Sequence, residues 1–283
     1  MLFFSNSLTI KLVKRQTDLS DQLSQDLSQL DPTSSTIPNP PSSSVSNTLT
    51  TNTKVPIYDI CSMPQSFALT FDDGPSEFSA GLDTLLNSNG AKASFFVNGN
   101  NVGCIYDYAP VLIARFNAGH LIGSHTWSHI HLNSATYEEI NQQLDLLEQA
   151  LIKILGVKPR WFRPPYGEYN DLVLQVLAER GYKGLVLWTH ATGDANSNPP
   201  SPDSIVQFYQ SYGEKSNILN HEITSSTPQT VIPAVLPQLG EKFKLVTAPS
   251  CLNLSNDPKD WYQFVGTPST KDASWTCSGT PSG

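Results

Sequence analysis

Positively charged side chains and long apolar runs are both scarce in this chain of 283 residues. Lysine and arginine number 17 against 25 acidic residues, and the net charge of −8 argues against binding to nucleic acid or another polyanion. No apolar run reaches the ~18 residues that a membrane-spanning helix needs, so no transmembrane segment is expected. The 39% hydrophobic content suits one domain of about 200 residues with tails.

Cysteine is also sparse, and none of it has Cys-x-x-Cys spacing. The four residues are Cys61, Cys104, Cys251 and Cys277. An even number without that spacing favours disulfides over structural zinc ligands, and disulfides indicate an oxidising compartment. Four cysteines allow three connectivities, and the residues alone do not choose between them.

The first 55 residues are predicted to be a leader or pro-region followed by a linker. Residues 5–11 are too polar for a good signal peptide, whereas Lys14-Arg15 resembles a dibasic processing site. This suits a secreted precursor that is trimmed or incomplete at its start. Residues 31–54 are rich in Ser, Thr, Pro and Asn, which predicts a disordered, O-glycosylated linker. Asn253 begins a candidate N-glycosylation sequon.

Between residues 66 and 247, short apolar segments alternate with segments of helical periodicity. The best helix spans 136–155, where Thr136 and Glu139 form a capping box before an apolar face. Seven strands are predicted at 66–71, 93–97, 120–124, 160–163, 183–189, 217–221 and 242–246. Such alternation indicates a parallel, barrel-like α/β fold with seven strands, whose site lies at the carboxyl ends of the strands.

Two adjacent carboxylates, Asp72 and Asp73, end an apolar segment in the run Thr-Phe-Asp-Asp-Gly-Pro at 70–75. Neighbouring residues of an extended chain point to opposite sides, so the two can take different tasks. The Gly-Pro pair then turns the backbone where a loop can open a site. An isolated run of this kind would more simply be a solvated turn.

His125 and His129 lie four residues apart, so that one helical turn would bring both imidazoles to one side. Alone, the pair is more simply one packed and one solvated histidine. With one aspartate added, it becomes the open two-histidine, one-carboxylate set that holds a divalent metal and leaves room for water and substrate. The second aspartate is then free to act as a base.

Two later residues fit the same chemistry. Arg163 follows an apolar stretch and precedes two prolines, so that a rigid loop can aim its guanidinium at a carboxylate. His221 ends another apolar segment. The plainer interpretations are a surface turn and a histidine that caps a strand.

These motifs, in this order, resemble those of the polysaccharide deacetylases, the NodB-homology group of carbohydrate esterases, and most of all the fungal chitin deacetylases. The segments that carry the resemblance are 70–75, 125–129, 163–167 and 219–221, and it covers roughly residues 56–265. It implies a metal-dependent hydrolase that removes N-acetyl groups from chitin or chito-oligosaccharides. A monomer, secreted or in the cell wall, is expected.

The resemblance also implies roles for particular residues. Asp73, His125 and His129 would bind zinc, with cobalt or another divalent cation as alternatives. Asp72 would be the general base, Arg163 would orient it, and His221 would be the general acid. The backbone N–H of Tyr166 would help to bind the oxyanion, and Trp188 is a candidate substrate contact. Likeness to the fungal members implies pairing of Cys61 with Cys251, and so of Cys104 with Cys277. The catalytic domain is expected at 56–250 and a C-terminal extension at 251–283.

One motif departs from the family, which usually has Asp-Thr-x-Asp followed by an aromatic. This chain has Ala191 in place of the first aspartate, Asp194 at the second and Ala195 in place of the aromatic. In relatives the first aspartate supports the histidine acid, so its loss predicts a lowered pKa for His221. The neighbouring His190 is expected to be a solvated loop residue.

The departure keeps other functions open. One is a glycan-binding pseudoenzyme with little or no turnover, and another is a deacetylase of a different glycan such as xylan or peptidoglycan. A third is a non-haem iron oxygenase, because two histidines and one carboxylate also hold Fe(II). The Arg163 and His221 motifs and the α/β pattern weigh against the third.

Overall fold

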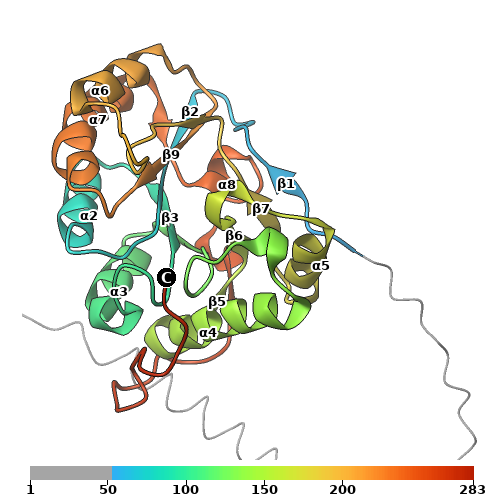
Figure 1. Ribbon diagram of the computed structural model, residues 1–283. Helices are drawn as coiled ribbons and strands as arrows, with labels where there is room; N and C mark the ends of the chain where they lie inside the picture. Colours follow the sequence, from blue (N-terminus) through green and yellow to red (C-terminus); the bar gives the residue numbers. More distant parts are fainter. Residues whose placement is uncertain (1–52) are drawn as a thin grey trace, which may run out of the picture. The chain divides into compact units, whose positions relative to one another are not determined.

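A curled parallel β-sheet forms the centre of the protein in the computed structural model, which describes residues 53–283 (Figure 1). The strand order is β1-β7-β6-β4-β3-β2-β9-β8, and β10 also pairs with β2. The expectations for the leader, the dibasic site and nearly all of the linker lie outside the described residues. Every strand pair of this sheet is parallel, so the chain crosses outside the sheet between successive strands.

All seven expected strands are present, and the barrel-like α/β class is confirmed. The sheet nevertheless has nine strands, because β1 and β8 join its two edges. These two strands have two residues each, too few for an alternating pattern to reveal them. The strands are β1 (Ile57–Tyr58), β2 (Ser66–Asp72), β3 (Ala93–Val97), β4 (Leu121–Ser124), β6 (Trp161–Phe162), β7 (Gly184–Val186), β8 (His190–Ala191), β9 (Ser216–His221) and β10 (Lys244–Leu245).

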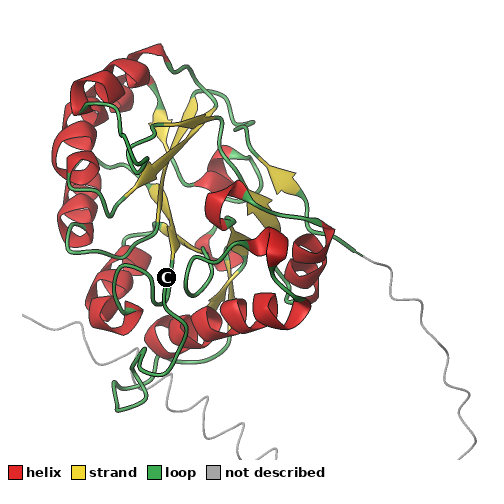
Figure 2. Cartoon of the chain, viewed as in Figure 1, coloured by secondary structure: helices red, strands yellow, loops and turns green. Residues whose placement is uncertain are grey.

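Helices cover the outer side of the sheet (Figure 2). The longest, α4, begins after Thr136 with the expected capping box to Glu139 and ends at Gly156, which has the left-handed conformation. The helices are α2 (Ser79–Ser88), α3 (Ala109–Asn117), α4 (Tyr137–Leu155), α5 (Asp171–Glu179), α6 (Pro202–Ser211), α7 (Ile232–Lys242) and α8 (Ala248–Cys251). Single turns are η1 (Ile105–Tyr108), η2 (Leu132–Ser134), η3 (Pro165–Gly167), η4 (Thr227–Val231) and η5 (Pro258–Asp260).

The central strand β2 is buried along its whole length, with β3 on one side and β9 on the other. Its sequence alternates all the same, because large apolar residues on one face are interleaved with small or polar residues on the other, and both faces are buried. Its phenylalanines and leucine belong to the main apolar core, which the helices close. Strand β2 therefore gives a rigid base to the residues at its carboxyl end.

The segment after residue 250 packs against the rest of the described chain. Strand β11 (Tyr262–Phe264) pairs antiparallel with β5 (Val157–Pro159) in a second, two-stranded sheet. The hydroxyl of Tyr262 accepts a hydrogen bond from the backbone N–H of Ile122 in β4, at 2.8 Å. The division at 250 between catalytic domain and extension stays a prediction.

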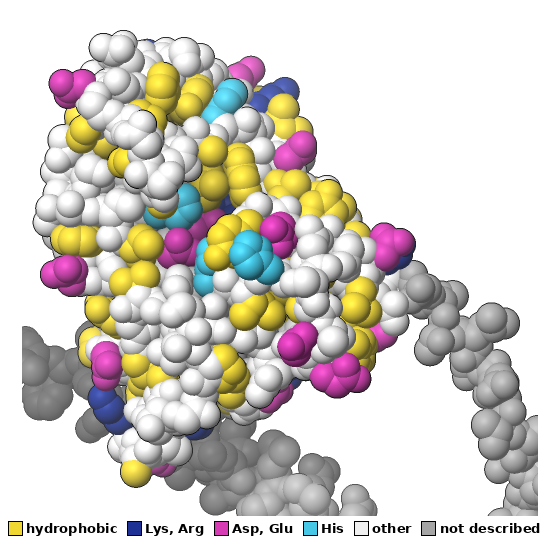
Figure 3. Space-filling view, viewed as in Figure 1, with side chains coloured by type: hydrophobic (Ala, Val, Ile, Leu, Met, Phe, Trp, Pro, Cys, Tyr) yellow, Lys and Arg dark blue, Asp and Glu magenta, His cyan; other side chains and the backbone are white. Residues whose placement is uncertain are grey.

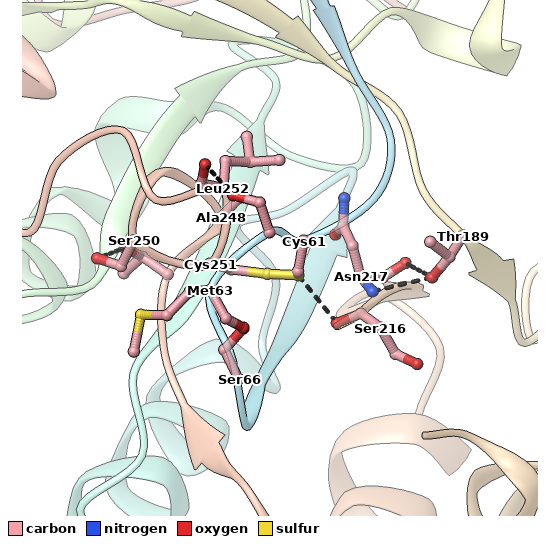
Figure 4. The surroundings of a disulfide bond; sticks show 12 residues. Cys61, Met63, Ser66, Thr189, Ser216, Asn217, Ala248, Ser250, Cys251 and Leu252 are labelled. Atoms are coloured by element: carbon pink, nitrogen blue, oxygen red, sulfur yellow. Dashed lines mark hydrogen bonds between the residues drawn. A yellow bond between two sulfur atoms is a disulfide. The ribbon is translucent and has the colours of Figure 1, made fainter. Parts of the chain in front are cut away.

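Both disulfides have the expected pairing. Cys61 joins Cys251 (Figure 4), and Cys104 joins Cys277. The first bridge packs with Ala68 of β2. The Cα atoms are 4.9 and 5.7 Å apart, within the usual range for disulfides. Within residues 53–283, no helix is long and apolar enough to cross a membrane.

Candidate metal centre and active site

The predicted site residues meet where the carboxyl ends of the parallel strands converge. Asp72 ends β2 and lies directly opposite His221, which ends β9. His125 follows β4, and Arg163 follows β6. Histidine and acidic side chains gather near the middle of the face shown in Figure 3. Topology thus brings together residues that lie up to 149 positions apart, as Asp72 and His221 do by their numbers.

Asp73, His125 and His129 form a three-residue group whose candidate ligand atoms all lie within 4.8 Å of one another. Asp73 Oδ1 is 3.4 Å from His125 Nε2 and 3.2 Å from His129 Nε2. Ligands at about 2.0–2.1 Å from a tetrahedral zinc ion lie roughly 3.3 Å apart. The spacing of the three side chains therefore fits a divalent metal.

Asp73 Oδ1 gives a second test of this fit. This oxygen is buried and accepts no hydrogen bond within the described residues, although buried carboxylate oxygens are nearly always paired. The two imidazole nitrogens face it at 3.4 and 3.2 Å without forming a hydrogen bond to it. A cation at this position would satisfy the oxygen and both nitrogens together, so the group can bind a metal.

Neighbouring groups prepare the histidines for this role. His125 Nδ1 lies 2.7 Å from the carbonyl oxygen of Arg163, which can only accept a hydrogen bond. Nδ1 therefore carries the proton, and the lone pair of neutral His125 is on Nε2, facing Asp73. Burial lowers the pKa of His129 to about 4, which keeps its imidazole neutral.

The pKa of Asp73 is also set by this group. Burial raises the pKa of Asp73, but the neighbouring histidines, His125 foremost, lower it more, so that it falls to about 2. A metal requires deprotonated ligands. Across neutral pH, the carboxylate is ionised and His129 is neutral, as ligation needs.

Backbone conformation at the site is unusual. Asp73, Thr126, His129 and Tyr166 have positive φ angles of 70°, 69°, 54° and 58°. The left-handed region is unfavourable for residues other than glycine, and such residues cluster at functional sites. Here it turns the side chains of Asp73 and His129 out of the strand-end loops toward each other.

Arg163 forms an ion pair with Asp72 that fixes the position of its carboxylate. Its guanidinium is fully buried, and Nη1 donates to Asp72 Oδ1 at 2.9 Å and to the hydroxyl of Thr70 at 2.6 Å. Nε donates to the carbonyl oxygen of Val186, and Nη2 donates to that of Leu187. Asp72 Oδ1 is thus fixed by a charged partner. Its other oxygen, Oδ2, lies 3.8 Å from Nε2 of His125, one of the three candidate metal ligands.

His221 is held by Asp194, which corrects the expected effect of Ala191. Nδ1 of His221 lies 2.7 Å from Asp194 Oδ1, and the backbone N–H of His221 donates to Asp194 Oδ2 at 2.9 Å. Burial lowers the pKa of His221, but Asp194 raises it more, to about 9. The prediction of a lowered pKa was wrong, because the second aspartate of the motif supplies the carboxylate partner.

Two aromatic residues lie at the rim of the site. Tyr166, in η3, packs edge-on against His129 with ring centroids 4.6 Å apart and stacks on His131 at 4.1 Å. Trp188 is half-buried, with its ring 5.7 Å from the guanidinium carbon of Arg163. All eight predicted site residues thus lie in one neighbourhood.

Comparison with known proteins decides the family. A polysaccharide deacetylase model matches residues 60–185. A chitin deacetylase of Pestalotiopsis sp is 36% identical over 216 residues, which cover 74% of this chain and 70% of the relative. The chain belongs to the polysaccharide deacetylase family. The protein is therefore a polysaccharide deacetylase, an amide hydrolase, as its motifs predicted.

Solved structures agree with this assignment to the polysaccharide deacetylases. The chitin deacetylase structure of Colletotrichum lindemuthianum has a TM-score of 0.67 and 28% identity, and the match covers 73% of this chain and 95% of that one. The sequence of a chitin deacetylase from the same fungus is 32% identical over 85% of its length. A probable peptidoglycan-N-acetylglucosamine deacetylase of Arthroderma benhamiae is 32% identical over 208 residues. This match covers 72% of the present chain but only 47% of the relative, about half its length.

Sequence reasoning missed what holds His221 in place. Asp194 was matched to the family motif, but its contact with His221 crosses between β8 and β9 and has no local signal. The hydroxyl of Thr227 donates to Asp194 Oδ2 at 2.6 Å and completes the arrangement. Ala191 is exposed and lies opposite Leu219, and His190 is exposed and stacks on Tyr212.

Proposed function

We propose that the protein is a metal-dependent hydrolase that removes N-acetyl groups from chitin or chito-oligosaccharides. One observation carries the proposal. An open three-ligand group lies between a carboxylate fixed by a buried arginine and a histidine whose pKa is raised to about 9. This arrangement offers both a base and an acid at neutral pH. The names of the fungal relatives support chitin as the substrate.

Asp73, His125 and His129 would hold the metal, which we propose to be zinc. When bound, a zinc ion supplies a Lewis acid that polarises the acetamide carbonyl and lowers the pKa of a water molecule. One carboxylate and two neutral imidazoles are ligands that zinc accepts readily. Cobalt and other divalent cations accept the same set, so the choice of metal is part of the test.

Protein side chains would carry out the two proton transfers of the reaction. Asp72 takes a proton from the attacking water, whose oxygen bonds to the carbonyl carbon of the acetamide. Arg163 directs Asp72 at the water, because its other donors are fixed by hydrogen bonds to the protein. His221 then gives a proton to the nitrogen as the C–N bond breaks, which yields acetate and an amine.

Tyr166 and Trp188 would contact the substrate. The backbone N–H of Tyr166 lies in a left-handed turn beside His129, and we propose that it donates to the oxyanion of the tetrahedral intermediate. The half-buried ring of Trp188 would contact the acetyl group or the sugar. Two disulfides support a place outside the cell or in its wall.

Acetate release from a panel of acetylated glycans tests the proposal. We expect activity on chito-oligosaccharides, loss of activity after chelation, and recovery with zinc or cobalt. A preference for acetylated xylan or peptidoglycan would replace the substrate, and binding without acetate release would indicate the pseudoenzyme. Activity that survives complete metal removal would overturn the metal-dependent mechanism.

A further inference from the structure

A second cluster of buried charges lies directly behind the site. Glu222, the residue after His221, is 0% exposed, and Arg115 of α3 is also 0% exposed. Arg115 donates to both carboxylate oxygens of Glu222, with Nη1 2.9 Å from Oε1 and Nη2 2.7 Å from Oε2. Its Nε donates to Asp83 of α2 at 3.1 Å. The proposed chemistry uses none of these three side chains.

Glu222 also contacts the loop that carries the proposed base and a proposed metal ligand. Its backbone N–H donates to the carbonyl oxygen of Asp72 at 3.3 Å, and its own carbonyl oxygen accepts from the hydroxyl of Ser76 at 2.8 Å. Its Oε2 accepts a hydrogen bond from the hydroxyl of Ser79 at 2.5 Å. The residue therefore joins the end of β9 to the loop between β2 and α2.

The side chain of Glu222 packs closely against the backbone of this loop at Gly74. A Cβ atom at Gly74 would lie only 1.9 Å from Glu222 Oε1, so the glycine is needed for the carboxylate to approach the backbone. Gly74 directly follows Asp73. A shift of the Glu222 carboxylate would move the backbone next to the base and the metal group.

Stability alone does not account for this cluster. A buried ion pair seldom stabilises a protein more than apolar residues of the same size would, because both charges must leave water. Buried pairs are nevertheless rigid when every oxygen is hydrogen-bonded, as those of Glu222 are. The cluster is placed where rigidity fixes the distance between the acid and the base.

We propose that Glu222, held by Arg115, is a positioning residue that sets the imidazole of His221 against Asp72 and Asp73. The inference rests on the proposed function, in which His221 is the acid. Nε2 of His221 lies 4.0 Å from Asp73 Oδ2, so the substrate nitrogen has to fit a narrow space. Small rotations of the strand end would misplace the proton donor without removing it.

Glu222→Gln tests the proposal, and Glu148→Gln is its matched control. Glu148 of α4 is 1% exposed and is also held by one arginine, with Arg180 Nε and Nη2 at 2.9 and 2.8 Å. Both variants should lose similar thermal stability. We expect Glu222→Gln to lower kcat at least tenfold, about 1.4 kcal/mol of barrier, with KM and metal content unchanged. Glu148→Gln should keep the wild-type kcat.

A second measurement does not depend on turnover. In the wild-type protein, the Nδ1 proton of His221, held by Asp194, should give a sharp downfield NMR signal. Glu222→Gln should broaden or shift this signal, and Glu148→Gln should leave it in place. Ser79→Ala removes one hydrogen bond to Glu222 and replaces Glu222→Gln in this test if that variant does not fold. It should broaden or shift the His221 signal, but less than Glu222→Gln would.

The outcomes separate the two proposals. Wild-type protein without acetate release, together with an altered His221 signal in Glu222→Gln, would overturn the proposed function and leave the positioning role standing. An active wild-type protein with an unchanged kcat and signal in Glu222→Gln would overturn the positioning role. Equal losses of kcat in Glu222→Gln and Glu148→Gln would also overturn it, because they would indicate a general loss of rigidity.

Discussion

Charged partners control the two ionisable groups that we assign to proton transfer. Asp72 accepts from buried Arg163, and His221 lies against buried Asp194. In both pairs the partner has other hydrogen bonds that fix its position, such as that from Thr227 to Asp194. The orientation of each group therefore depends on one neighbour, which a single substitution can remove.

Asp194→Asn should move the alkaline limb of the pH profile of kcat/KM to lower pH. Without the negative charge, the pKa of His221 falls from about 9 toward its ordinary value near 6.5. A deprotonated imidazole cannot protonate the leaving amine, so activity should decline at least about one pH unit earlier. Asp145→Asn, on the outer helix α4, should leave the limb in place.

Ala191→Asp gives a contrasting control for the same measurement. Because Asp194 already holds His221, a new carboxylate at exposed position 191 should leave the pH profile unchanged. An upward shift of the alkaline limb in Ala191→Asp would restore the role that the family pattern gives to the first aspartate.

Asp72→Asn should separate the base from the metal ligands. The variant keeps Asp73, His125 and His129, so its metal content should match that of the wild-type protein. Its turnover should fall at least about a hundredfold, within the range that general bases contribute. Asp73→Asn should instead lose the metal itself. Metal analysis and acetate release are measured together, and a tenfold or smaller loss in Asp72→Asn would be too little for an essential base.

At the scale of elements, the sequence predicted what is long and periodic. Seven strands and helix α4 follow from apolar patterning and from the capping box at Thr136. The two-residue strands β1 and β8 depend on pairing with neighbours far along the chain, which no local pattern encodes.

The site residues likewise fall into those that the sequence predicted and those that it did not. The motifs indicated every proposed metal ligand and every proposed proton carrier, because those residues lie at strand ends in recognisable runs. Their supports were not predictable from local sequence, since Asp194 and Arg115 reach their partners across 27 and 107 positions. Arg163 was the exception, because the rigid Pro-Pro turn after it already indicated a fixed guanidinium.

The segment 277–281 supports the loop between the two histidines. The indole N–H of Trp127 lies 3.0 Å from both the hydroxyl of Thr280 and the carbonyl oxygen of Pro281, and the bridge from Cys104 to Cys277 fixes this segment. Replacing both Cys104 and Cys277 with serine should therefore lower the melting temperature and also weaken metal binding.

The other disulfide provides the control. Replacement of Cys61 and Cys251 with serine should lower the melting temperature comparably, because each bridge stabilises by about 2–4 kcal/mol. It should leave metal affinity unchanged, since that bridge lies beside β2 and α8. Metal titration of both double variants is the measurement. Equal metal affinities in the two would refute the role of segment 277–281.

For the whole molecule, the placement of β2 has a consequence for synthesis. Its partner β3 leaves the ribosome soon after it, but β9 follows much later, and Thr70 donates to a carbonyl oxygen 148 residues away. Until then, one apolar edge of the nascent sheet has no partner and can pair with other chains. A chain that stopped at residue 185 would keep that edge open and should aggregate during translation rather than accumulate as a smaller enzyme.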